Sequence, residues 1–267
     1  MEIEMKHPIC TPPDTGSLLQ KATDQMRSHA SAKTLATMGW LFLCVSAAHA
    51  QAIRQDAGTK ILIPSSSRTT TFTSLLAVIN LDSQPDEVTI TARRSDGTLL
   101  GTPISTTIPV GGRFRSDDIL RDMGVPVHPW SYGPIVVEST NNRLLSAVSD
   151  VINSQGPGGF FPAVNATTAW REGFITDVTD TGDPGDVGTF RTNLAVNNLG
   201  EAPADVTIAF FDDSGSRLGT TTVTVPANGM AQLNSVVRTL LNSRHEATGR
   251  NGFLKLTSNQ PIHACQG

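Results

Sequence analysis

A repeat within the sequence limits the possible folds more than any other feature of this chain. Residues 71–102 align with residues 189–220 without a gap, and 15 of the 32 aligned positions are identical. Both segments open with the pattern T-F-x-x-x-L-A-V-x-N-L, and both close with L-G-T. We therefore expect one folding unit to occur twice in the chain.

Both copies carry the signals of short β-strands. Apolar and polar side chains alternate in residues 88–92 and again in 206–210, as they do in strands with one buried face. Glycines within 95–97 and 213–215 suit hairpin turns, because glycine adopts a positive φ without steric cost. The pattern predicts two sets of antiparallel strands joined by tight turns.

One short helical segment interrupts each copy after these strands. Asp117 is the expected N-cap of the first helix and Asn234 that of the second, each ahead of apolar residues that would face a core. Many short strands, regular turns and one short helix per copy predict an all-β protein built of two tandem β-sandwiches.

Residues 26–50 have the parts of a secretory signal peptide. Basic residues precede an apolar run at 35–48, and the small residues Ala48 and Ala50 fit a cleavage site. The run is too short to span a bilayer comfortably, so we expect a secreted or cell-envelope protein with no transmembrane span in the mature chain. An uncleaved membrane anchor is the alternative. Residues 1–25 are polar, and we expect them to be a non-native N-terminal extension.

Beyond the signal, the chain divides into three expected segments. Residues 51–160 form the first sandwich, 161–188 a linker and first-strand segment, and 189–267 the second sandwich. Ile262–Gly267 aligns with Leu144–Ser149, where the first copy continues and the second stops. A shortened strand exposes unpaired backbone groups. We expect the second module to be C-terminally truncated, with self-association through the C-terminal edge as the alternative.

Composition and motifs give no indication of catalysis. The net charge of −4 gives no basic surface for nucleic acid. The sequence contains none of the common signatures of nucleotide-binding sites, zinc proteases or serine hydrolases. We expect a protein that is not an enzyme and that needs no cofactor, with calcium as the one exception considered below.

The repeated motifs are familiar from one group of proteins. Ile63-Pro64 and Phe161-Pro162, the T-F-x-x-x-L-A-V-x-N-L segments and the glycine hairpins resemble tandem immunoglobulin-like repeats of secreted bacterial proteins. The resemblance implies two immunoglobulin-like β-sandwiches in a protein with an adhesive, scaffolding or accessory binding role at the cell surface. It also implies an extracellular protein or glycan as partner. The alternatives are a carbohydrate-binding accessory module and a detached C-terminal module of a secreted hydrolase.

Four aspartates recur at every third residue between the two copies. These are Asp177, Asp180, Asp183 and Asp186. Carboxylates on a glycine-rich loop are ligands that suit Ca²⁺, which takes six to eight oxygen atoms. The alternative is a solvated linker without a metal.

Trp130 and Tyr132 form an aromatic pair in a predicted loop. Aromatic rings at the end of a sandwich stack on sugars or peptides, or they plug the end of the core. We favour the plug, because a buried ring removes much apolar area from water, and keep ligand stacking as the alternative.

Leu75 and Ile79 are expected to point away from the core of the first copy. Side chains alternate along a strand, so these residues face outward if Leu76 and Val78 face inward. Their counterparts in the second copy are asparagines. We expect the apolar stripe to be a partner contact, covered by the linker, by the other module or by another molecule.

Overall fold

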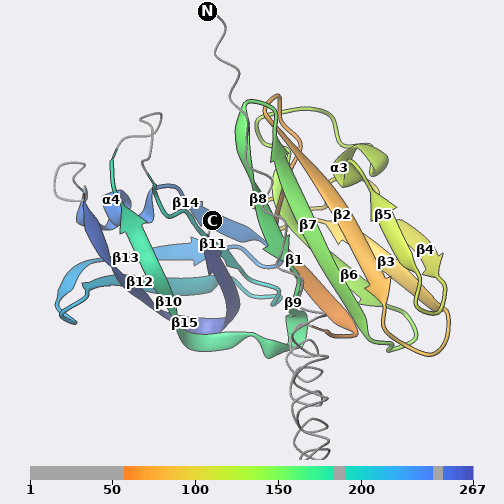
Figure 1. Cartoon of the computed structure of the whole chain (residues 1–267). Coiled ribbons are helices and arrows are strands. Elements are labelled where there is room, and N and C mark those ends of the chain that lie inside the picture. The colour runs from red at the N-terminus through yellow and green to blue at the C-terminus, as the bar shows by residue number, and fades with distance from the viewer. Residues whose placement is uncertain (1–56, 183–189, 243–248, 267) are drawn as a thin grey trace, which may run out of the picture. The chain divides into compact units, whose positions relative to one another are not determined.

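The computed structural model describes residues 57–182, 190–242 and 249–266, all of which lie in one compact unit, Gln55–Gly267 (Figure 1). The described chain is all-β, with antiparallel sheets and two short α-helices. The expected signal peptide and N-terminal extension lie outside the described residues. Neither α-helix of the described part is long and apolar enough to cross a membrane.

The N-terminal half, residues 57–165, packs one sheet against another. The sheets have strand orders β4-β3-β6-β1-β9 and β5-β2-β7-β8. The elements are β1 (Lys60–Ser67), β2 (Phe72–Asn80), β3 (Asp86–Ala92), β4 (Ile104–Ile108), β5 (Arg113–Ser116), α3 (Ile119–Asp122), β6 (Tyr132–Ser139), β7 (Leu145–Asn153), β8 (Gly156–Pro162) and β9 (Val164–Asn165).

Alternation along the strands builds the core of this half. Leu76 and Val78 of β2 point inward from one sheet, and Ile90 of β3 and Val137 of β6 point inward from the other. All four side chains are fully buried. The spacing of apolar residues in the sequence therefore fixes which face of each strand meets the core.

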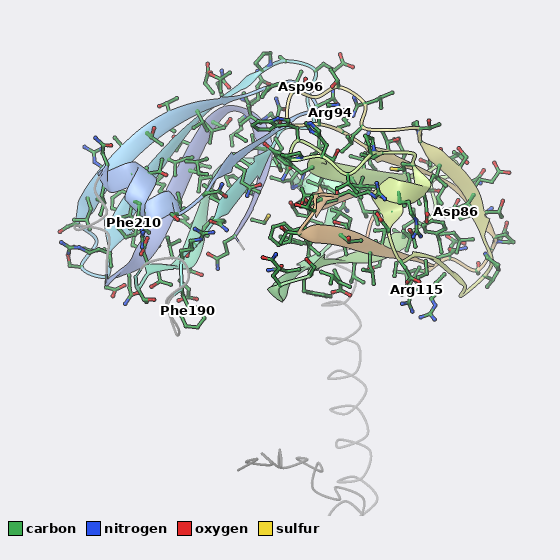
Figure 2. The ribbon with its side chains drawn as sticks, turned by 90° about the horizontal axis from the view of Figure 1, so that it is seen from above. Asp86, Arg94, Asp96, Arg115, Phe190 and Phe210 are labelled. Carbon is green, nitrogen blue, oxygen red and sulfur yellow. The ribbon has the colours of Figure 1, made fainter. Side chains whose placement is uncertain are left out.

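The C-terminal half, residues 166–266, has its own core and a long final strand. Its elements are η1 (Ala166–Thr168), β10 (Trp170–Asp180), β11 (Leu194–Asn197), β12 (Ala204–Asp212), β13 (Arg217–Val225), β14 (Met230–Leu233), α4 (Val236–Leu241) and β15 (Arg250–Gln266). The first part of β15 pairs with β10 and β12, and its last residues pair with β11. The fully buried Phe210 of β12 is the largest core side chain (Figure 2).

The predicted turns and helices are largely confirmed. Gly97 and Gly215 have positive φ in the expected hairpins. Each half contains one α-helix, but the caps differ from the predicted ones. Asp118, rather than Asp117, accepts a hydrogen bond from the backbone N–H of Arg121, at 3.0 Å. The helix α4 has no side-chain cap.

The boundary between the halves lies later than expected. Phe161-Pro162 belongs to β8, which pairs with β7 in the N-terminal half. The range 161–188 also contains β10, an eleven-residue strand of the C-terminal half. The segment 161–188 was expected to hold a linker and a first strand, and β10 is the first strand of the C-terminal half.

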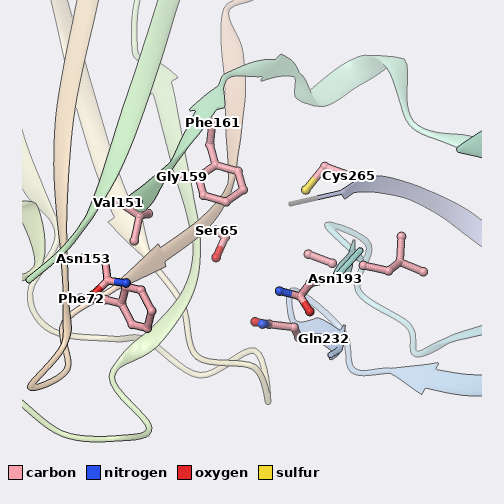
Figure 3. Close-up of a pocket in the computed structure, with 12 residues that line it drawn as sticks. Ser65, Phe72, Val151, Asn153, Gly159, Phe161, Asn193, Gln232 and Cys265 are labelled. Atoms are coloured by element: carbon pink, nitrogen blue, oxygen red, sulfur yellow. The ribbon is translucent and has the colours of Figure 1, made fainter. Parts of the chain in front are cut away.

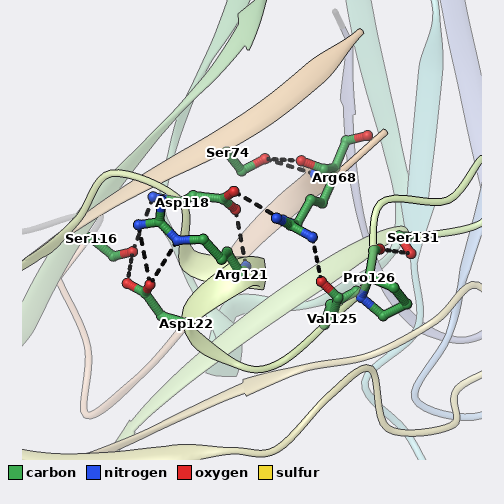
Figure 4. A network of polar contacts seen from close by, with 10 residues as sticks. Arg68, Ser74, Ser116, Asp118, Arg121, Asp122, Val125, Pro126 and Ser131 are labelled. Atoms are coloured by element: carbon green, nitrogen blue, oxygen red, sulfur yellow. Dashed lines mark hydrogen bonds and ion pairs between the residues drawn. The ribbon is translucent and has the colours of Figure 1, made fainter. Parts of the chain in front are cut away.

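In each half an ion pair joins the α-helix to the first strand. The basic residue lies at the strand in the N-terminal half and on the helix in the C-terminal half. Near the end of β1, Arg68 Nε donates to Asp118 Oδ2 at 2.9 Å, and Arg68 Nη1 donates to the Val125 carbonyl at 2.7 Å (Figure 4). In the C-terminal half the acid ends the strand and the base lies on the helix. Arg238 Nε and Nη2 donate to the two oxygens of Asp180, at 2.5 and 2.7 Å.

Candidate functional site

A groove between the two halves is lined by residues from both of them. One cavity of about 250 Å³ lies between Phe72 and Phe161 on one side and Asn193 and Cys265 on the other (Figure 3). The remaining lining residues are Ser65, Val151, Asn153, Gly158, Gly159, Leu194, Ala195 and Gln232.

A second cavity of about 410 Å³ continues the first. The two share five lining residues, namely Ser65, Phe72, Val151, Phe161 and Gln232. The second cavity adds Ser67, Thr69, Pro129, Trp130, Tyr132 and Asn234. We call the two cavities together the groove.

The loop that carries Trp130 is held by hydrogen bonds. The Ser131 backbone N–H donates to the His128 carbonyl at 2.9 Å, and the Ser131 hydroxyl donates to the Pro126 carbonyl at 2.9 Å (Figure 4). The Trp130 backbone N–H donates to His128 Nδ1 at 3.2 Å. The loop is thereby fixed while the indole stays 67% exposed.

The exposure of Trp130 decides between the two sequence interpretations for this residue. A ring that plugs the core would be buried, so the plug interpretation does not fit Trp130. Tyr132 is half-buried at the start of β6 and lines the same cavity as Trp130. The predicted aromatic pair therefore faces one groove.

Amide side chains form part of the wall contributed by the C-terminal half. Gln232 Nε2 donates to Asn234 Oδ1 at 2.8 Å, and Asn193 Oδ1 accepts from the Ser235 backbone N–H at 3.0 Å. Each amide has one oxygen and one nitrogen, so each retains a second polar group beyond the bond named here. These groups can bind the hydroxyls of a ligand.

Cys265 is a half-buried thiol in the wall of the groove. Burial raises the pKa of Cys265 to about 12. The thiolate is the nucleophilic form, so this cysteine is a poor nucleophile at neutral pH. A disulfide through Cys265 is therefore a weak explanation for self-association at the C-terminal edge. Residues His263–Gln266 of that edge pair with β11.

The four aspartates of the calcium hypothesis do not share one environment. Asp180 is 1% exposed, and Arg238 occupies both of its oxygens. Asp177 is exposed at a bulge of β10 and has a positive φ. Asp183 and Asp186 lie outside the described residues. A calcium site that uses Asp180 would have to displace a paired arginine.

Two sheet faces, one in each half, point away from the cores and behave differently. We define the N-terminal outer face as the side of β5-β2-β7-β8 that points away from the core. It carries Leu75, Ala77, Ile79, Val148, Ile152 and Phe160. Ile79 is 41% exposed and Leu75 is half-buried, so the outward orientation holds, but no other described element covers this face. Cover by the other module does not fit this exposure, and cover by another molecule stays a prediction.

The C-terminal outer face is the equivalent side of β11, β14 and β15. It carries Asn193, Ala195, Asn197, Met230, Gln232, His263 and Cys265. Asn197, Met230 and His263 are buried, and β11 and β15 contact β1 of the N-terminal half. The Met230 backbone N–H also donates to the Ser95 carbonyl at 3.0 Å. The polar face is therefore the covered one.

Sequence reasoning found the aromatic loop but missed most of the groove. Phe72, Phe161 and Gln232 line both cavities, yet they lie far apart in the chain. No spacing or motif in the sequence links them. Among the described residues, no group of three or more histidine, cysteine or acidic side chains is placed to hold a metal ion.

Comparisons with known proteins add little to this geometry. No family model matches the chain, and no curated protein matches it. Ten chains of solved structures match it. One is described as the Anabaena sensory rhodopsin transducer, with 17% identity and a TM-score of 0.32 over 37% of this chain and 96% of that chain. A TM-score this low supports no statement about fold or function.

Proposed function

We propose that this protein is an exported, non-catalytic binding protein that holds a neutral glycan in the groove. Its setting is the cell surface or the medium, in the adhesive or accessory role that the sequence resemblance implies. On this proposal the two halves are duplicated immunoglobulin-like sandwiches. The exposed Trp130 at an uncharged groove carries the proposal.

The aromatic residues supply a stacking surface. The faces of sugar rings present C–H groups, and these pack against the electron-rich faces of aromatic rings. Trp130 and Tyr132 lie on the same cavity, and Phe72 and Phe161 extend the apolar surface into the adjoining one. A fixed loop also favours binding, because little side-chain freedom is lost when the ligand arrives.

The polar residues of the groove suit hydroxyl groups. Amides and hydroxyls both donate and accept hydrogen bonds, as sugar hydroxyls do. The groove contains both kinds, in Gln232, Asn234, Ser67 and Thr69. A few placed polar groups within an apolar cavity are the usual composition of a small-molecule site.

The absence of charge narrows the ligand class. The described residues that line the two cavities include no aspartate, glutamate, lysine or arginine. An ionic ligand would lose its hydration there without a compensating partner. Neutral glycans are therefore favoured over uronic acids, sulfated sugars and phosphate-bearing ligands.

A glycan array of neutral and acidic oligosaccharides tests the proposal. We expect the purified protein to bind one class of neutral glycan and to change its tryptophan fluorescence on binding. Trp130→Ala should weaken binding by about tenfold or more, because stacking contributes on the order of 1 kcal/mol or more.

Phe190→Ala is the matched control, since Phe190 is 68% exposed and lies outside both cavities. It should bind like the unchanged protein. The proposal fails if no neutral glycan binds, or if Trp130→Ala and Gln232→Ala both leave the affinity unchanged.

A further inference from the structure

The N-terminal outer face is an uncovered apolar surface with a charged margin. Ile79, Ile152 and Phe160 are 41%, 51% and 63% exposed. Arg113 and Arg115 lie on the edge strand β5, and Asp150 lies on β7, all on the same face (Figure 2 labels Arg115). Exposed apolar surface of this extent in a folded protein commonly marks an interaction site.

The covered C-terminal outer face differs in chemistry from the uncovered N-terminal outer face. Met230 and Gln232 stand where the N-terminal face has Arg113 and Arg115, because β14 pairs with β11 as β5 pairs with β2. The covered face thus has no formal charge, whereas the uncovered face has charges of both signs. Charges at an interface need partners of opposite sign.

The register places these charges symmetrically. Arg113 pairs with Ile79 on one side of β2, and Asp150 pairs with Leu75 on the other. Ala77 lies midway between Ile79 and Leu75 on the same strand. A two-fold axis in the plane of the face that passes near Ala77, perpendicular to the line from Arg113 to Asp150, therefore brings Arg113 of each copy over Asp150 of the other copy.

The area of the face is sufficient for weak self-association. Strands lie about 4.8 Å apart and rise about 3.4 Å per residue, so β5, β2, β7 and β8, with 4, 9, 9 and 7 residues, cover about 470 Å². Two such faces together bury on the order of 950 Å², which is the size of a weak, transient interface.

We propose that the N-terminal outer face is the interface of a two-fold symmetric homodimer. Leu75, Ile79 and Phe160 form its apolar part, and the Arg113–Asp150 pairs fix its orientation. The proposal does not depend on the glycan groove, whose lining residues from this sheet are mainly on its core side.

Sedimentation velocity over a range of concentrations tests the proposal. We expect the purified protein to dimerise, and Leu75→Asn with Ile79→Asn to raise the dimer Kd by roughly 30-fold or more. Phe190→Asn, an equally polar change at an exposed site in the other half, should leave the Kd unchanged. A circular dichroism melt confirms that each variant is folded. If the double variant does not fold, Phe160→Asn replaces it.

Charge reversal tests the symmetry itself. Arg113→Asp and Asp150→Arg should each weaken the homodimer by about 5-fold or more, because both pairs then become like-charged. An equimolar mixture of the two variants should restore dimerisation as a heterodimer. A protein that is monomeric at all concentrations, or a dimer insensitive to Leu75→Asn with Ile79→Asn, overturns the proposal. If the mixture fails to restore association, the two-fold arrangement is wrong.

Discussion

Ile79 and Asn197 occupy equivalent outward positions on β2 and β11, yet Ile79 is 41% exposed and Asn197 is fully buried. The apolar residue meets solvent and the polar residue meets the protein interior. Local hydrophobicity therefore does not determine which sheet face is covered. The packing of one half against the other determines it.

The ion pairs of the two helices extend this comparison. Each half joins its helix to the end of its first strand, but arginine and aspartate have exchanged places. An ion pair of this kind needs opposite charges and bidentate or near-bidentate geometry. Either residue can lie at the strand, as long as the other lies at the helix. The two halves keep the interaction while they change the residues.

The largest expected effect concerns the cores. Phe210 and Ala92 occupy equivalent core positions on β12 and β3. Phe210→Ala should lower the free energy of unfolding of the C-terminal half by about 3–5 kcal/mol, because it leaves a cavity. Urea denaturation followed by fluorescence and circular dichroism measures this loss.

The control for the core comparison is Phe190→Ala, which removes the same ring from an exposed site. Its effect should stay within about 0.5 kcal/mol. Equal effects of the two substitutions would contradict the burial assigned to Phe210.

The second prediction reverses the polarity of an ion pair. Asp180→Asn should destabilise the C-terminal half by about 2–4 kcal/mol, because a neutral amide replaces the buried carboxylate that accepts two hydrogen bonds from Arg238. Chemical denaturation of Asp180→Arg combined with Arg238→Asp should show recovery of most of that loss. The double variant reproduces the polarity of the N-terminal half. If stability does not recover, the groups around the pair, rather than the pair alone, determine which of the two positions takes the acid and which takes the base.

A smaller effect is expected at Asn197. Among the described residues, neither polar atom of its buried amide has a hydrogen-bond partner, and an unpaired buried polar group costs about 1–3 kcal/mol. Asn197→Leu has a similar shape and should stabilise the protein by roughly 1 kcal/mol, measured as a higher urea midpoint. Destabilisation instead would show that the amide is satisfied in solution, for example by a bound water.

The smallest effect concerns pH. Burial lowers the pKa of His263 from its usual value near 6.5, although Nε2 bonds to the Ala166 carbonyl at 3.2 Å. The unfolded chain then binds a proton at a higher pH than the folded chain does. Stability should be complete above about pH 7 and should fall as the pH drops below 6.5, by roughly 1 kcal/mol or less.

His263→Gln should flatten this pH dependence, while His128→Gln, at an exposed position, should preserve it. Thermal melts at pH 5.5 and 7.5 compare the three proteins. A His263→Gln variant with an unchanged slope would assign the pH dependence to other groups.

The strands, turns and helices of the two halves were predictable because they depend on local pattern. The alternation in residues 88–92 and 206–210 places those residues in β3 and β12, and glycine permits the positive φ at Gly97 and Gly215. The orientation of Ile79 follows from the same alternation. These features need no knowledge of the rest of the chain.

Register at the last strand was decided by the tertiary structure. The sequence offset of 118 aligns His263 with Leu145, which would put the imidazole in the core. The pairing of β15 with β11 instead puts Ile262 in the core and His263 on the outer face. The second copy runs on as one strand, β15, where the first copy is interrupted between β6 and β7. A shift of one residue in such a strand reverses the face of every side chain.

The groove also depends on tertiary contacts. Trp130 is recognisable in the sequence, but the groove that it lines also includes Phe161 and Gln232, which lie 31 and 102 residues later in the chain. The sequence by itself determined the all-β class, the turns and the inward faces, since each rests on residues a few positions apart. Only the tertiary structure decided which outer face is covered and which residues share a groove, because both depend on contacts between segments distant in the chain.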